Sequence, residues 1–95
     1  MDALRARYPN RVPVKVASKQ RLKREKFLVP HDMNLHALLF VLRKHMDGVG
    51  EKDALFVNVE GTVPRLTATL GELEAAHCRG SAALCVYVNK ESVFG

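Results

Sequence analysis

Two cysteines and four histidines are the side chains of this 95-residue chain that suit nucleophilic catalysis or metal binding. A nucleophile needs a base within reach and a third group that orients the base. Cys78 follows His77 directly, but neighbouring residues point in different directions, and Cys85 lies in an apolar strand segment where a small core side chain is expected. The histidines lack the spacing of a zinc site. We therefore predict no enzyme active site, no metal and no cofactor.

The end of the chain offers a different chemistry, because Phe94 and Gly95 close a segment that has no core pattern of its own. A glycine carboxylate can be adenylated, transferred to an enzyme cysteine as a thioester and then attacked by an amine. Glycine has no Cβ, so such a segment can enter a narrow channel at any backbone angle. Phe94 would give a partner enzyme an apolar anchor beside the reacting carbonyl. These features indicate Gly95 as a conjugation site.

Length and charge limit the class of protein and its partners. A chain of 95 residues forms one domain, too small for large cofactor-wrapping folds. Residues 1–30 hold nine Lys or Arg and two acids, a net +7, whereas residues 31–95 hold six and eight, a net −2. This asymmetry favours nucleic acid, an anionic membrane or an acidic peptide as partner, unless the basic third is only a solvated face. Without an apolar signal or spanning segment, we expect a cytoplasmic protein with reduced thiols.

The elements that must position these residues follow from hydrophobic periodicity. Alternating valines predict a strand over 11–18, and an apolar stretch that ends at a proline predicts an edge strand over 23–30. Leucines at helical spacing predict a helix over 35–46 with Asn34 as its cap. A strand over 54–59 should follow.

The last third of the chain continues the alternation of helix and strand. A short helix should begin after Thr67 or Thr69, where Thr69 and Glu72 have the spacing of a capping box. A dense apolar strand is predicted over 83–88, and residues 89–95 should form a flexible tail.

This order of elements predicts an α+β fold of the ubiquitin-like β-grasp type. A mixed four-stranded sheet would carry one main helix on one face, with a short second helix. A ferredoxin-like fold competes less well, because its order is β-α-β-β-α-β and this chain opens with two strands. Residues 1–95 are then a single domain.

Five segments, in order, resemble one known family. They are RYPNRVPV at 7–14, KFLVP at 26–30, DALF at 53–56, TATLG at 67–71 and ESVFG at 91–95. Over roughly residues 7–95 the chain is similar to the autophagy-related protein 8 family, which includes the GABA-receptor-associated protein and the microtubule-associated light chains. The family's members are ubiquitin-like modifiers of autophagy.

The resemblance implies a conjugation pathway for Gly95. An E1-like enzyme would activate the glycine, an E2-like enzyme would receive it, and the amine of phosphatidylethanolamine on autophagosome membranes would accept it. A processing cysteine protease would expose the glycine and later release it from the lipid. The resemblance therefore implies a cytoplasmic pool and a lipid-conjugated membrane pool.

The resemblance also implies docking of cargo-receptor peptides that carry an aromatic-x-x-aliphatic motif. Such a peptide would add as a strand to the open edge of the second strand. The edge would be formed by Lys26, Phe27 and Leu28, and the peptide's acids would meet Arg11, Arg24 and Lys26. The aromatic pocket would be bordered by Pro13, Lys26 and Leu28, and the aliphatic pocket by Phe27, Val29, Pro30, Met33, Leu38 and Val41. For Phe27, Leu38 and Val41 an ordinary core position is the alternative.

Four departures from the family pattern bear on these expectations. We expect the family's N-terminal helical extension to be largely absent, since only residues 1–7 precede the Tyr-Pro segment, and the hairpin connection to be shorter. Lys15 stands where an apolar residue is usual, and Ala83 stands where a large aromatic is usual. These changes weaken the aromatic pocket more than the aliphatic pocket or the glycine tail.

Two other functions stay open at this level. One is a sister autophagy modifier, similar to autophagy-related protein 12, whose glycine is joined to a protein lysine. The other is a basic binding module that is never conjugated. Only Tyr8 and Phe27 lie near the basic residues, so the chain offers little for base stacking and we expect no specific nucleic acid partner.

Overall fold

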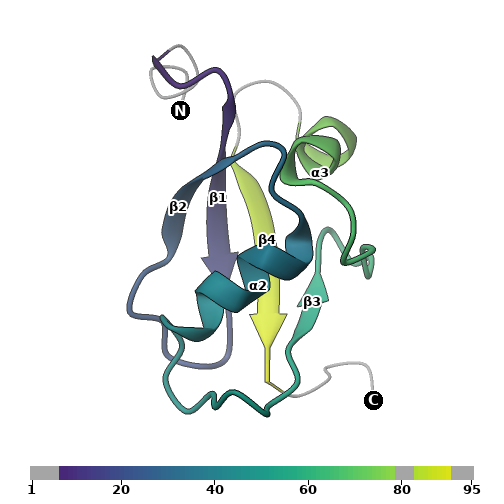
Figure 1. Cartoon of the computed structure of the whole chain (residues 1–95). Coiled ribbons are helices and arrows are strands. Elements are labelled where there is room, and N and C mark those ends of the chain that lie inside the picture. Colours follow the sequence, from purple (N-terminus) through teal and green to yellow (C-terminus); the bar gives the residue numbers. More distant parts are fainter. Residues whose placement is uncertain (1–6, 79–82, 91–95) are drawn as a thin grey trace.

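The computed structural model describes residues 7–78 and 83–90, which form a four-stranded sheet with two helices (Figure 1). The elements, in chain order, are β1 (Arg11–Ala17), β2 (Lys26–Pro30), α2 (Leu35–Arg43), β3 (Phe56–Asn58), α3 (Leu70–His77) and β4 (Leu84–Asn89). The strand order is β2-β1-β4-β3, with β1 and β4 parallel and both outer pairs antiparallel. Helix α2 crosses one face of the sheet (Figure 1). The predicted ubiquitin-like fold is confirmed.

Strand β1 is central and carries the alternation that predicted it. Its valines are at most 2% exposed. Pro13 is tolerated in this central strand because the parallel pairing with β4 begins one residue later, at Val14 and Leu84, so the missing N–H costs no ladder bond. The strand ends at Ala17 rather than Ser18, whose hydroxyl accepts the N–H of Gln20 at 3.1 Å and starts the turn.

Strand β2 begins three residues later than the predicted residue 23. The N–H of Lys23 donates to the carbonyl of His45 at 2.7 Å, and Leu22 forms an isolated bridge with Met46. Residues 22 and 23 therefore bond to the segment that follows α2, and pairing of β2 with β1 starts only at Lys26.

Helix α2 begins as predicted, because the side chain of Asn34 accepts the N–H of Ala37 at 2.8 Å. Its apolar stripe is buried and consists of Leu35, Leu38, Leu39 and Leu42. The predicted end at Met46 is wrong, since the helix ends at Arg43. Residues 44–46 bond to carbonyls three positions back, a tighter turn that still buries Met46 at 4% exposure.

Strand β3 is shorter than predicted, and α3 starts where its capping box predicted. Val59 lies outside β3 because it pairs with Thr62 across a tight turn, in which Glu60 and Gly61 have positive φ. At the start of α3, Thr69 Oγ1 accepts the N–H of Glu72 at 3.1 Å, and Glu72 Oε2 accepts the N–H of Thr69 at 3.2 Å.

Strand β4 corrects two predictions. It runs to Asn89, which pairs with Phe56 and is 2% exposed, so the predicted tail cannot begin at residue 89. Cys85 is exposed rather than part of the core, because Leu84, Val86 and Val88 face the core and the pleat turns Cys85 to the opposite face. Residues 91–95, with Phe94 and Gly95, lie outside the described residues, as do residues 1–6 of the N-terminal extension.

Candidate functional site

The outer edge of β2 is the part of the sheet where a further strand could add. Two backbone hydrogen bonds flank the β1–β2 ladder. The N–H of Val16 donates to the carbonyl of Glu25 at 2.8 Å, and the N–H of His31 donates to the carbonyl of Asn10 at 3.0 Å. Both bonds join an even-numbered residue on the β1 side to an odd-numbered residue on the β2 side. Antiparallel ladders bond alternate residues, so Phe27 and Val29 bond to β1. The backbone groups of Lys26 and Leu28 therefore face the open edge.

Two arginines cap the carbonyls of this edge. Arg24 Nε donates to the carbonyl of Lys26 at 2.9 Å, and Arg11 Nη1 donates to the carbonyl of Leu28 at 3.3 Å. A docking strand would use these same two carbonyls. The sequence predicted that both arginines meet the acids of a peptide, but it contains no signal for their contacts with the edge.

The predicted aliphatic pocket divides into buried and accessible residues. Leu38 is 0% exposed and belongs to the core, and Val29 is 7% exposed. Pro30, Met33 and Val41 are half-buried, and the pleat of β2 places Pro30 on the same face as Leu28, opposite the core face. The core alternative therefore applies to Leu38 and to Phe27, which belongs to the same buried core, while Met33 and Val41 keep some exposed surface.

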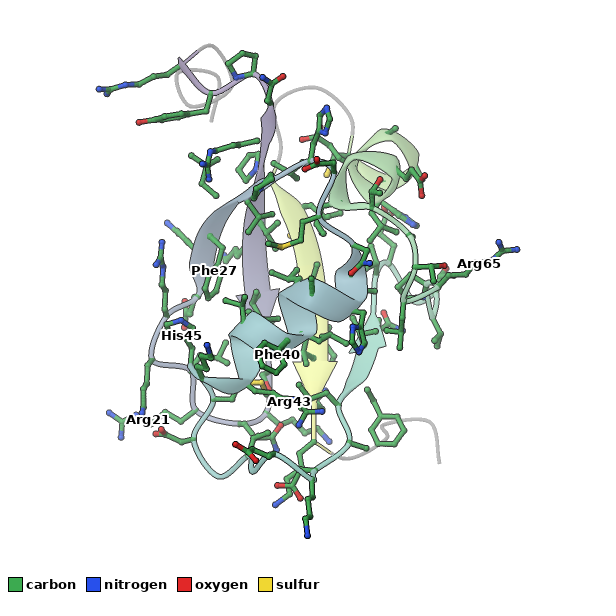
Figure 2. All side chains as sticks on the ribbon, in the orientation of Figure 1. Arg21, Phe27, Phe40, Arg43, His45 and Arg65 are labelled. Carbon is green, nitrogen blue, oxygen red and sulfur yellow. The ribbon has the colours of Figure 1, made fainter. Side chains whose placement is uncertain are left out.

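Phe27 links this pocket to the arginine caps. It is 7% exposed, and the guanidinium of Arg24 lies 4.9 Å from its ring centroid. The rings of Phe27 and His45 pack edge to face, with their centroids 5.4 Å apart, on the side of the molecule formed by β2 (Figure 2). His45 was not among the predicted docking residues. Its signal in the sequence is the four-residue spacing from Val41, which places both on one helical face.

The predicted aromatic pocket lies on the sheet face opposite α2. Pro13 and Leu28 are register partners, as are Lys15 and Lys26, so the structure brings these residues together. Pro13 is buried and Leu28 is half-buried, whereas both lysines are exposed. Ala83 is half-buried at the start of β4. Pro13 is less than 2% exposed, so Leu28 supplies the accessible apolar surface of this face, beside two positive charges.

The charges at this edge favour an acidic ligand. Arg11, Lys15, Arg24 and Lys26 are exposed along it, and Glu25 is the exposed acid among them. Four positive charges and one negative charge leave a local net +3. Such a field attracts acids and selects against basic ligands.

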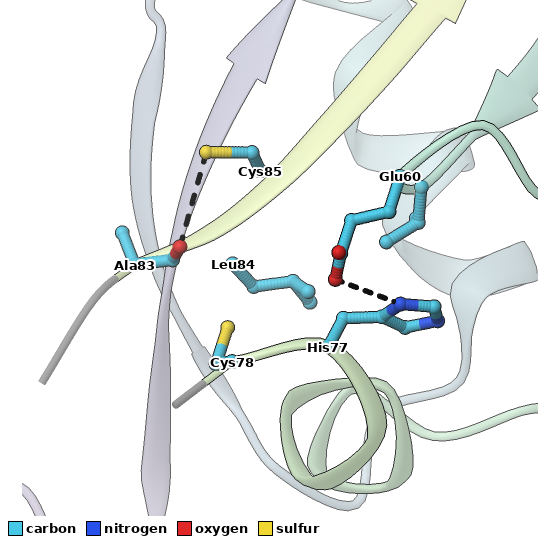
Figure 3. A pocket seen from close by; sticks show the side chains of 7 residues that line it. Glu60, His77, Cys78, Ala83, Leu84 and Cys85 are labelled. Atoms are coloured by element: carbon cyan, nitrogen blue, oxygen red, sulfur yellow. Dashed lines mark hydrogen bonds and ion pairs between the residues drawn. The ribbon is translucent and has the colours of Figure 1, made fainter. Parts of the chain in front are cut away.

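The two thiols line a separate cavity of about 240 Å³ between α3 and β4 (Figure 3). His77 Nδ1 lies 3.0 Å from Glu60 Oε1, and the thiol of Cys85 points to the carbonyl of Ala83 at 3.9 Å. The imidazole of His77 is therefore engaged by the carboxylate of Glu60. Across residues 7–78 and 83–90, no three His, Cys, Asp or Glu side chains gather where they could hold a metal ion. In the same ranges no helix has the length and hydropathy of a membrane span.

The mixed sheet, the crossing helix and the open edge define a ubiquitin-like domain. Residues 1–95 match the model of the family described as "Autophagy protein Atg8 ubiquitin like". The chain therefore belongs to the Atg8 family, as the five sequence segments predicted.

Two solved structures from parasites are similar to this chain. Trypanosoma brucei ATG8 is 27% identical with a TM-score of 0.80, and the match covers 99% of this chain and 84% of that chain. Plasmodium falciparum Atg8, solved in complex with a Plasmodium falciparum Atg3 peptide, is 24% identical with a TM-score of 0.73. That match covers 96% of this chain and 85% of the other, and at this identity it supports the fold.

Proposed function

We propose that this chain is a non-catalytic modifier of autophagy that is conjugated through Gly95 to phosphatidylethanolamine and docks cargo-receptor peptides at the β2 edge. Membership of the Atg8 family and the Phe-Gly ending support the conjugation. The single observation that supports docking is the basic, open edge of β2, where the backbone groups of Lys26 and Leu28 face outward.

Docking would exchange one set of hydrogen bonds for another. A peptide strand bonding to Lys26 and Leu28 must displace Arg24 and Arg11 from the edge carbonyls. An acidic peptide compensates for this loss, because each freed guanidinium can form a charge-assisted bond with a carboxylate. A peptide without acids leaves the arginines without such partners. The caps would therefore add selectivity for acidic peptides.

The two side chains of the motif would lie on opposite sides of the added strand. The aliphatic residue would contact the half-buried surface of Met33 and Val41. The aromatic residue would contact Leu28, with the stem of Lys26 at the border, because Pro13 is less than 2% exposed. The larger aromatic usual at position 83 is replaced by alanine, so we expect the aliphatic contact to provide more of the affinity.

The partners follow from the same proposal. The Plasmodium relative was solved with an Atg3 peptide, which supports an E2-like enzyme as partner of this chain. An E1-like enzyme, a processing cysteine protease and an ethanolamine lipid complete the proposed cycle. The protein would then exist in a cytoplasmic pool and a pool conjugated to autophagosome membranes.

A reconstituted reaction tests the conjugation. The protein is incubated with the E1-like and E2-like enzymes, ATP and vesicles of phosphatidylethanolamine and phosphatidylcholine, and mass spectrometry identifies what is bonded to Gly95. We expect an adduct that a phospholipase shortens and that Gly95→Ala abolishes. A stable conjugate to a protein lysine would instead establish the sister-modifier function, and a normal lipid adduct after deletion of Gly95 would refute the proposal.

Peptide titration tests the docking. A synthetic peptide with the aromatic-x-x-aliphatic motif and flanking acids should bind, and the amide resonances of Lys26 and Leu28 should shift. Failure to bind the peptide, combined with RNA affinity that stays strong and sequence-selective at physiological salt, would favour the basic binding module, since nonspecific electrostatic binding falls steeply with salt.

A further inference from the structure

The end of β4 is held by a set of hydrogen bonds that the docking edge does not use. Asn89 is 2% exposed, and a buried side-chain amide is stable only with partners. Its Oδ1 accepts the N–H of Lys19 at 2.7 Å and the hydroxyl of Ser18 at 3.4 Å. The connection between β1 and β2 is thus bonded to a residue 70 positions later in the chain.

Lys90, the next residue, is held by both its backbone and its side chain. Its N–H donates to Oε1 of Gln20 at 2.9 Å. Its Nζ donates to the carbonyl of Gly48 at 3.1 Å and lies 3.5 Å from Oδ2 of Asp53. Two separate loops therefore hold the last described residue, one between β1 and β2 and the other between α2 and β3.

The second loop is itself fixed to α2. Asp53 Oδ2 accepts the N–H of Gly50 at 2.7 Å, and this bond lowers the pKa of the Asp53 carboxyl. Arg43 reaches from α2 to the carbonyls of Gly50 and Asp53 (Figure 2). The carboxylate that pairs with Lys90 is therefore held by its own loop, and the loop is held by Arg43. We call these contacts of Ser18, Lys19, Gln20, Gly48, Asp53, Asn89 and Lys90 the β4-end network.

We propose that Gln20, Asp53 and Asn89 are positioning residues that set where and in which direction the chain leaves the sheet towards Gly95. This inference rests on the proposed conjugation through that glycine. An activating enzyme must order the segment that it captures, and this ordering costs conformational entropy. If Lys90 is fixed at one point and in one direction, residues 91–95 start from a defined place and the enzyme has fewer chain arrangements to exclude.

The pairing of β4 with β3 alone would not give this control. The register partners Phe56 and Asn89 mark the end of that ladder, and β3 has only three residues. Lys90 follows the ladder and depends on Gln20 for its N–H bond. The direction of the chain at Lys90 therefore comes from the loops rather than from the sheet.

Kinetics of thioester formation on the E1-like enzyme test the proposal. Gln20→Ala removes the acceptor of the Lys90 N–H and leaves the core untouched. The KM of the E1-like enzyme for this protein should therefore rise about fivefold, which corresponds to the loss of one hydrogen bond. The kcat should change little. Gln20→Glu keeps an acceptor oxygen and should restore the KM of the wild type. Asp53→Asn should raise KM by a smaller factor.

Asp47→Asn is the matched control for Asp53→Asn. Asp47 also pairs with a lysine, Lys23, at 3.8 Å, but it has no contact in the β4-end network. This variant should keep the wild-type KM. Thermal unfolding of every variant separates positioning from stability, because a structural role would lower Tm without selectively raising KM.

Hydrogen exchange at the Lys90 amide gives a readout that does not depend on the enzymes. Exchange should accelerate in Gln20→Ala and return to the wild-type rate in Gln20→Glu. If exchange accelerates while thioester formation keeps its wild-type KM, the positioning role is refuted and the conjugation stands. If the wild-type protein forms no thioester, the proposed function fails, and the positioning role fails with it.

Discussion

The β2 edge and the end of β4 both have backbone groups hydrogen-bonded to side chains, but the two sets of bonds differ in burial and in the role we propose for them. At the β2 edge, Arg11 and Arg24 donate to backbone carbonyls from exposed positions. At the end of β4, the side chains of Gln20 and Asn89 accept backbone N–H groups from half-buried and buried positions. Exposed bonds exchange readily with water or a ligand, whereas loss of a buried bond leaves an unsatisfied polar group. Burial thus separates an edge that can receive a partner from a junction that holds the chain.

The largest expected effect concerns the core beneath the β2 edge. Leu38→Ala should lower the free energy of unfolding by about 2–5 kcal/mol, because a fully buried leucine leaves a cavity. Val41→Ala, at a half-buried position on the same helix, should cost about 1 kcal/mol or less and weaken peptide binding instead. Urea unfolding and peptide titration of both variants measure the difference. Equal loss of stability would show that Val41 is core.

The next effect concerns the outward backbone of β2. Leu28→Pro removes an N–H that faces the edge and takes no part in the ladder with β1, so the fold should persist while peptide affinity falls by about tenfold or more. Leu28→Val keeps the N–H and should bind more tightly than the proline variant. Circular dichroism and titration calorimetry report the two outcomes. Wild-type affinity in Leu28→Pro would rule out strand addition at this edge.

A smaller effect concerns the exchangeable caps. Arg24→Ala removes both the cap on Lys26 and a partner for peptide acids. An acidic peptide should then bind about fivefold more weakly, the worth of one charge-assisted bond. When its acids are replaced by glutamine or asparagine, the same peptide should bind Arg24→Ala at least as tightly as it binds the wild-type protein. Equal weakening of both peptides would contradict the exchange of bonds.

The smallest effect is a pH dependence at the other end of the molecule. The N–H of Gly50 lowers the pKa of Asp53, and the neighbouring Lys90 acts in the same direction. Because the folded pKa lies below the unfolded value, the contribution to stability is present above about pH 4 and is lost as the pH falls through the folded pKa. Carboxyl NMR titration should give a midpoint for Asp53 below the ordinary aspartate value of about 4. A midpoint for Asp53 at or above the ordinary aspartate value would refute this contribution of the Asp53 carboxylate to stability.

Local patterns predicted the elements well because each depends on residues close in sequence. The alternation of Val12, Val14 and Val16 and the leucine stripe after Asn34 gave a strand and a helix that the structure confirms. The capping box at Thr69 is also local and is confirmed. One error occurs where a distant segment competes for the backbone, since the N–H of Lys23 bonds to His45 instead of extending β2, and the others occur at the ends of β1, α2 and β3, where a local turn closes the element early.

Side-chain exposure at the candidate site was harder to predict. Cys85 was assigned to the core from its apolar neighbours, yet the pleat exposes it. Leu38 and Val41 are three residues apart on α2 but differ in burial, because Leu38 belongs to the buried stripe of the helix and Val41 does not. Periodicity gives the face of an element, whereas the packing of other elements decides how deeply each residue on that face is covered.

The sequence by itself determined the order of elements, the basic character of the β2 strand and the family to which the chain belongs. Those properties depend on residue type and short spacing. The tertiary structure alone decided that two arginines cap the carbonyls of β2 and that Gln20 and Asn89 hold the end of β4. The contacts of Gln20 and Asn89 join residues 70 positions apart, and no local pattern encodes such a meeting because folding itself brings the two segments together.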